Sequence, residues 1–114
     1  MVNSRSKGKR GELLWRDFLR VHLNCPDAKR GQQHAGGTDS PDVVGGIPGT
    51  HPEVKNTEKF SLHPAMQQAI QDAGDLIPYV AHKRNHKPWV IVVQASDLEA
   101  FCRSVVEHLD KDTM

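Results

Sequence analysis

Three charged residues in the first half of the chain have types and spacing suited to phosphate chemistry. Glu53 and Lys55 are two apart, so on a strand they would project from one face while Val54 enters the core. Ten residues separate Asp42 from Glu53, enough for two short strands and a turn at Pro48-Gly49. A hairpin with this turn would bring Asp42 beside the other two side chains.

Such a set predicts metal-assisted hydrolysis of a phosphodiester. Two neighbouring carboxylates repel each other and are stable together only with a cation between them. Oxygen ligands suit Mg²⁺, which keeps several waters and can present one to a phosphate. We expect Mn²⁺ to substitute. The ammonium of Lys55 could orient or deprotonate that water, or neutralise charge at phosphorus. Glu12 would complete the acidic cluster if its helix packs across the sheet. The alternative for Glu53 and Lys55 is an exposed ion pair, worth under ~1 kcal/mol.

The order of these residues resembles a known nuclease motif. Pro41-Asp42 followed by Glu53-Val54-Lys55 is similar to the motif of the PD-(D/E)xK nuclease superfamily, whose core is an α-β-β-β-α-β fold. Over roughly residues 8–95 the chain most resembles small Holliday-junction resolvases of the archaeal Hjc type and related phage proteins. In those proteins Gly-rich residues and an early helical Glu precede the motif, as Gly8, Gly11 and Glu12 do here.

The resemblance implies a role for each residue of the motif. Asp42 and Glu53 would be metal ligands, with the carbonyl of Val54 a third. Lys55 would be the catalytic lysine, and Glu12 the outer acid of the metal cluster.

The same resemblance implies a glutamine on the helix after the Glu-x-Lys strand. Gln68 is the first choice for this catalytic position and Gln67 the second. Pro52 departs from the family pattern, in which an apolar strand residue is usual before Glu53. Because proline cannot donate to a ladder, the strand either lies at an edge there or begins at Glu53.

Basic and histidine side chains are the candidate DNA contacts. Their alternative interpretation is solvated surface charge. The histidines show no spacing typical of a zinc site. The candidates for DNA binding are Lys9, Arg10, Arg30, His34, His51 and Lys59.

Composition indicates one domain over residues 1–114, with residues 1–8 a flexible basic arm. Residues 1–35 carry eight Lys/Arg against three Asp/Glu, and residues 36–114 carry seven against eleven. This split is typical of a chain that meets a polyanion with its N-terminal part. No apolar stretch reaches the roughly 20 residues that span a bilayer, and the charged start is no secretory signal. We therefore expect a cytoplasmic protein without a membrane partner.

Hydrophobic periodicity predicts a helix over residues 11–23, a polar strand over 28–34, an apolar strand from Pro41 to Val44 and its hairpin partner over 51–56. A helix from Leu62 or His63 to Ala73 follows, then strands over 76–81 and 89–93. A last helix capped by Ser96 should bury four side chains: Leu98, Phe101, Val105 and Leu109. The order α-β-β-β-α-β-β-α predicts an α/β fold with a mixed sheet flanked by helices, as in a restriction-endonuclease-like core.

Together these patterns predict a Mg²⁺-dependent DNA endonuclease, most similar to a Holliday-junction resolvase, that leaves a 5′-phosphate and needs no small-molecule cofactor. Symmetric cutting of two strands requires two active sites, so a homodimer on branched DNA is expected. One alternative is a non-catalytic nucleic-acid-binding or assembly protein. Another is a nicking or restriction-like nuclease of the same fold.

Overall fold

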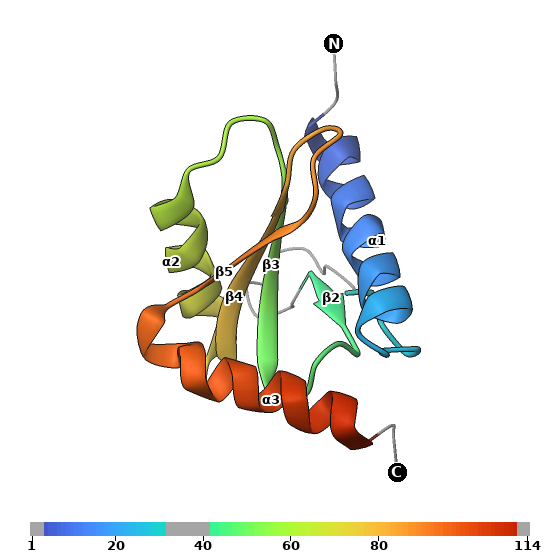
Figure 1. Ribbon diagram of the computed structural model, residues 1–114. Helices are drawn as coiled ribbons and strands as arrows, with labels where there is room; N and C mark the ends of the chain where they lie inside the picture. Colours follow the sequence, from blue (N-terminus) through green and yellow to red (C-terminus); the bar gives the residue numbers. More distant parts are fainter. Residues whose placement is uncertain (1–3, 32–41, 112–114) are drawn as a thin grey trace.

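The computed structural model describes residues 4–31 and 42–111 (Figure 1). The elements follow the predicted order, and a mixed sheet flanked by helices is confirmed. They are α1 (Ser4–His22), β1 (Lys29–Arg30), β2 (Val43–Val44), β3 (Thr50–Asn56), α2 (Leu62–Ala73), β4 (Ile77–Lys83), β5 (Val90–Val93), the 3₁₀ turn η1 (Ala95–Asp97) and α3 (Leu98–Lys111).

The larger sheet has three strands in the order β3-β4-β5. β3 runs parallel to β4, and β4 runs antiparallel to β5. In this sheet β3 is an edge strand, which explains how it accommodates Pro52 without losing a ladder hydrogen bond. The strand nevertheless begins at Thr50 and not at Glu53.

The predicted hairpin between the strand ending at Val44 and the strand over 51–56 is wrong. β2 pairs antiparallel with β1 instead, with Arg30 opposite Val43. Gly45 adopts a left-handed backbone (φ 77°), and a Cβ there would lie 2.5 Å from the carbonyl oxygen of Asp27. Only glycine can bring its backbone this close to Asp27. The contact lies where β2 ends, next to the segment that leads into β1. Of the predicted polar strand over 28–34, β1 covers two residues, and residues 32–34 lie outside the described part.

Helix α1 begins earlier than the sequence predicted. It starts at Ser4, so residues 4–8 of the predicted flexible arm are helical. Asn56 on β3 donates a hydrogen bond to the carbonyl of Lys7 at 3.0 Å, and Gly11 approaches the same asparagine closely. These two contacts hold the first turns of α1 against the end of β3.

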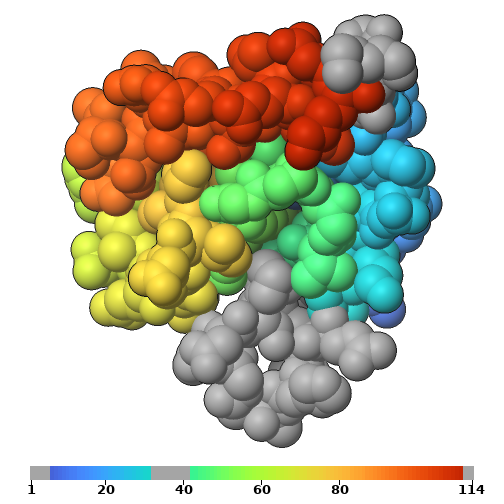
Figure 2. Space-filling model, turned by 90° about the horizontal axis from the view of Figure 1, so that it is seen from below, coloured from blue at the N-terminus to red at the C-terminus, as the bar shows by residue number. Residues whose placement is uncertain are grey.

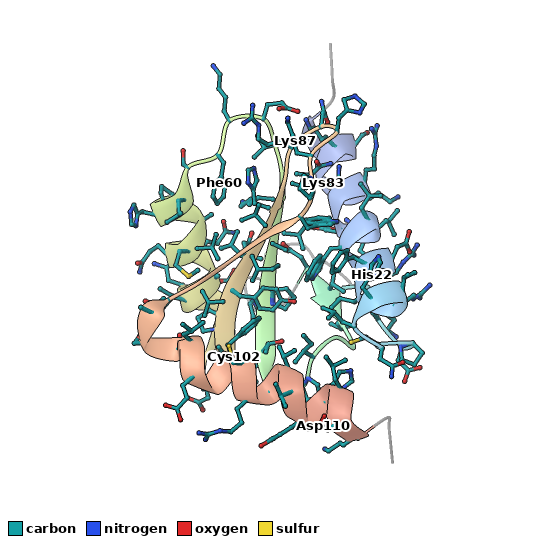
Figure 3. All side chains as sticks on the ribbon, viewed as in Figure 1. His22, Phe60, Lys83, Lys87, Cys102 and Asp110 are labelled. Carbon is teal, nitrogen blue, oxygen red and sulfur yellow. The ribbon has the colours of Figure 1, made fainter. Side chains whose placement is uncertain are left out.

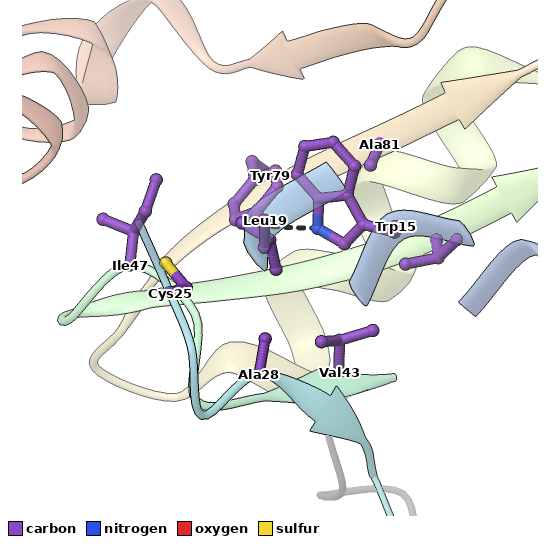
Figure 4. Close-up of a cluster of buried hydrophobic side chains, with 9 residues drawn as sticks. Trp15, Leu19, Cys25, Ala28, Val43, Ile47, Tyr79 and Ala81 are labelled. Carbon is purple, nitrogen blue, oxygen red and sulfur yellow. Dashed lines mark hydrogen bonds between the residues drawn. The ribbon is translucent and has the colours of Figure 1, made fainter. Parts of the chain in front are cut away.

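The two faces of the sheet are covered by different helices. Trp15 and Leu19 of α1 pack on one face with Val54 and Tyr79, and the indole N–H of Trp15 donates to the Tyr79 hydroxyl at 3.1 Å (Figure 4). On the other face three small or flexible side chains of α2 pack on Val80: Ala65, Met66 and Ala69. The pairing of Trp15 with Tyr79 leaves no polar atom unsatisfied at the centre of the first cluster.

Helix α3 lies across one end of the molecule (Figures 1 and 2). Phe101 and Val105 pack against the core as predicted, but Leu98 is 53% exposed, and no residue of α3 is fully buried. Ser96 does not cap the helix, because it lies inside η1. Among the described residues, no helix is both long and apolar enough to cross a membrane.

Candidate active site

Glu53 and Lys55 project from one face of β3, as their spacing predicted. Glu53 is in register with Val80, which packs under α2. The side chains of Glu53 and Lys55 therefore both face α2. The Lys55 Nζ lies 3.4 Å from Glu53 Oε1. Val54 points to the opposite face and is 8% exposed in the cluster with Trp15. The ion pair is therefore not a freely exposed one, because Glu53 itself is buried.

Asp42 reaches the motif from outside the sheet. Its Oδ2 accepts a hydrogen bond of 2.7 Å from the backbone N–H of Val54. The acid thus lies at the edge of β3, beside the backbone of the residue that separates Glu53 from Lys55, although no hairpin connects the strands. The N–H and C=O of one strand residue point to the same side. The carbonyl of Val54 therefore faces the same edge as Asp42.

One open cavity of about 390 Å³ unites these groups. It lies between α1, the edge of β3 and α2, and Gln68, the first-choice glutamine, lines it from α2. Glu12 lines it from α1. The full lining is Lys7, Gly8, Glu12, Asp42, Glu53, Val54, Lys55, Asn56, Thr57 and Gln68.

Two carboxyl groups of the cavity, those of Glu53 and Glu12, resist ionisation. Burial raises the pKa of Glu53 to about 7, with the negative charge of Asp42 adding to the rise and Lys55 opposing it. Burial also raises the pKa of Glu12, against the lowering effect of the hydrogen bond from Arg30. A cation placed between Glu53 and Asp42 would offset both burial and repulsion.

The donors present fit Mg²⁺ in part. Asp42, Glu53 and the Val54 carbonyl offer oxygen atoms at one edge, and Mg²⁺ needs only one or two carboxylates beside its waters. Within residues 4–31 and 42–111, however, no three His, Cys, Asp or Glu side chains converge as a metal-holding group. Glu12 instead forms a short ion pair with Arg30. The structure therefore brings two carboxylates, those of Asp42 and Glu53, into one cavity with Glu12.

The predicted DNA contacts have different surroundings. Lys9 and Arg10 are exposed on α1, and Lys59 is exposed after β3. Arg30 donates to Glu12 at the edge of the site. His51, also a predicted contact, is only 2% exposed on β3, and burial lowers its pKa, so it offers little surface to a ligand. His34 lies outside the described residues.

Sequence analysis missed Lys7, Asn56 and Thr57, all of which line the cavity. The signal for Lys7 was present. Lys7 is four residues before Gly11, so a helix begun at Ser4 would have placed Lys7 on the same side of the helix as this residue, which packs on β3. Asn56 was predicted at the end of the strand over 51–56, but its place beside the cavity depends on α1, whose Lys7 carbonyl accepts its hydrogen bond.

Comparisons with known proteins show no counterpart for this chain, since no protein-family model, no curated protein and no solved structure matches it. Its function has to be argued from the chemistry of the cavity.

Proposed function

We propose that this protein is a Mg²⁺-dependent DNA endonuclease of the PD-(D/E)xK type with a restriction-endonuclease-like core. The observation that carries the proposal is the meeting of Asp42, Glu53 and Lys55 around one cavity at the edge of β3. Mn²⁺ would substitute for Mg²⁺. No small-molecule cofactor is needed for this chemistry.

Each group of the cavity has a distinct task. Asp42, Glu53 and the Val54 carbonyl would hold Mg²⁺, which when bound supplies a Lewis acid that acidifies water and neutralises phosphate charge. Lys55 extends from the buried Glu53 toward solvent and can donate to a non-bridging phosphate oxygen. Gln68, on the opposite wall, can orient water with its amide. Water attacks phosphorus in line, the 3′ oxygen leaves with a proton, and the product keeps the 5′-phosphate.

The proposed substrate is branched DNA, cut by a homodimer. A chain of 114 residues covers little duplex, and paired cuts need two copies of one site. Lys7, Lys55 and Lys59 supply positive charge in and beside the cavity, where they would contact phosphates without reading bases.

A cleavage assay tests the proposal. A labelled four-way junction and a linear duplex of the same sequence are incubated with Mg²⁺ and with wild type, Lys55→Ala or Lys111→Ala. Lys111 is exposed at the end of α3 and serves as the charge-matched control. We expect wild type and Lys111→Ala to cut the junction and Lys55→Ala to lose at least about 100-fold in rate, as when one electrostatic donor is removed. Equal cutting by all three proteins would remove the proposed site. Cutting of the duplex alone would leave a nicking or restriction-like nuclease.

One observation favours a second candidate, a non-catalytic nucleic-acid-binding or assembly protein. The Arg30 guanidinium forms an ion pair with Glu12, which makes this carboxylate less available to a metal. Among the described residues, no group of three metal-ligating side chains converges. Metal-dependent melting separates the two candidates. For a nuclease, Mg²⁺ should raise the Tm of wild type, and Asp42→Asn should abolish the rise. A binding protein should show the same Tm with and without Mg²⁺.

A further inference from the structure

A second cavity adjoins the candidate active site. It has a volume of about 330 Å³, within the ~300–1,000 Å³ range of ligand clefts. It shares Lys55, Thr57 and Gln68 with the first cavity, so the two form one continuous surface. A polymer bound over Lys55 can extend from the first cavity into the second. Its remaining lining consists of Lys59, Phe60, Ser61, Pro64 and Ala65.

The two cavities differ in charge. The first contains three acids, Glu12, Asp42 and Glu53, together with Lys7 and Lys55. The described residues that line the second include two lysines and no acid. The first therefore suits a cation, and the second suits an anion such as a phosphodiester. A nucleic acid with its cleaved bond in the acidic cavity would place its next phosphate in the basic one.

The second cavity also has an apolar wall, made by Phe60, Pro64 and Ala65. Phe60 comes from the segment between β3 and α2 (Figure 3). Its ring stacks on His82 of β4, with 4.0 Å between centroids and 13° between planes. A half-buried aromatic ring fixed in this way offers an apolar surface to a base or sugar.

Hydrogen bonds hold the connecting segment in place before any ligand arrives. The Thr57 N–H donates to the Lys83 carbonyl at 3.1 Å, and His82 Nε2 donates to the Thr57 carbonyl at 3.0 Å. Glu58 accepts from the N–H of Asn85 at 2.7 Å. The cavity is thus tied to β4 and to the turn after it, which lowers the ordering cost of binding.

We propose that the second cavity binds one unpaired nucleotide of DNA next to the cleaved bond, with Lys59 on its phosphate and the wall at Phe60 against its base. A base inside a duplex is stacked and paired and cannot enter such a cavity without leaving the stack. The inference rests on the proposed nuclease function for its biological role. It restricts the substrate to DNA that presents an unpaired nucleotide at or near the branch.

Binding without metal tests this inference separately from cleavage. A fluorescein-labelled short oligothymidylate is titrated with protein in EDTA, and its anisotropy is measured over a range of salt concentrations. For Lys59→Ala we expect weaker binding and a slope of log affinity against log salt that is shallower by about 0.7, the value for one phosphate on a single strand. Lys111→Ala should keep the wild-type slope. Equal slopes for wild type and Lys59→Ala would overturn the phosphate contact.

The base is tested with an abasic probe of the same length. Wild type should bind it at least about fivefold more weakly than oligothymidylate, and Phe60→Ala should bind both alike. Because Phe60 packs on His82, circular dichroism first checks that the variant folds. If it does not, the wild-type comparison alone decides, and equal affinity for the two probes would overturn the base pocket. If the protein cleaves DNA, but neither Lys59→Ala nor the loss of the base changes binding of the probe, this inference alone is rejected. Binding as expected without any cleavage would reject the nuclease alone.

Discussion

At the scale of single residues, Glu53 carries the clearest conflict between stability and function. Its side chain is 7% exposed, and Asp42 adds a second negative charge at the edge of the same strand. Such a group destabilises the fold when ionised and is retained where a cation compensates it. The cation proposed to bind between Glu53 and Asp42 would remove this conflict.

The raised pKa of Glu53 sets a pH window for stability. Since the pKa is about 7 in the folded protein and 4.5 in the unfolded chain, the folded state holds the proton more tightly. The stabilising effect of the neutral carboxyl is complete below pH 4.5 and is lost as the pH rises to about 7. The full loss is about 3 kcal/mol.

Glu53→Gln should therefore gain stability relative to wild type across that window in metal-free buffer. Urea unfolding of both proteins at several pH values measures the difference. Glu99→Gln, at an exposed ion pair of α3, is the control and should run parallel to wild type. If the Glu53→Gln and wild-type curves are also parallel, the carboxyl is not held out of water.

At the scale of elements, the register of α1 on β3 positions Glu12 beside the motif. A Cβ at Gly11 would lie 2.5 Å from Cβ of Asn56, whereas a Cβ at Gly8 would meet nothing within 4 Å. Gly8→Ala should raise the free energy of unfolding by up to about 1 kcal/mol through helix propensity. Gly11→Ala should lower it by about 1–3 kcal/mol, because α1 must shift away from the strand.

Chemical denaturation of the two alanine variants compares them directly, each acting as the control for the other. Gly11→Ala should also weaken any stabilisation by Mg²⁺ more than Gly8→Ala does, since its shift moves Glu12. Equal stability of both variants would mean that α1 does not contact β3 at Asn56.

Local patterns in the sequence predicted most elements and named all but three of the residues that line the cavity. The Glu53-Val54-Lys55 alternation gave the correct faces, because a strand has a period of two residues whatever its partner. Strand partners depend on distant contacts. The hairpin from Val44 to Thr50 failed because Gly45 packs on the backbone of Asp27, a contact that no local pattern reveals. Asp42 still reaches Val54, through a side-chain hydrogen bond that replaces the expected ladder.

At the scale of the whole molecule, α3 closes the end of the fold with few buried side chains. Its polar attachment is His108, whose Nε2 lies 3.0 Å from the carbonyl oxygen of Leu23 and 3.1 Å from that of Asn24. Both partners are acceptors, so this nitrogen carries the proton. The Sγ of Cys25 lies 3.5 Å from the same atom. One imidazole thus joins α3 to the end of α1.

His108→Ala should loosen α3 before it unfolds the sheet. The loss should be about 1 kcal/mol for the hydrogen bonds, and hydrogen exchange should rise in α3 and in the residues after α1. Amides of β3 and β4 should keep their protection, because their contacts with α1 and α2 are unchanged. His63→Ala, at an exposed position of α2, should leave exchange in α3 unchanged. A uniform rise over β3, β4 and α3 would show that α3 and the sheet open together, and that the candidate site depends on the helix at the far end of its strand.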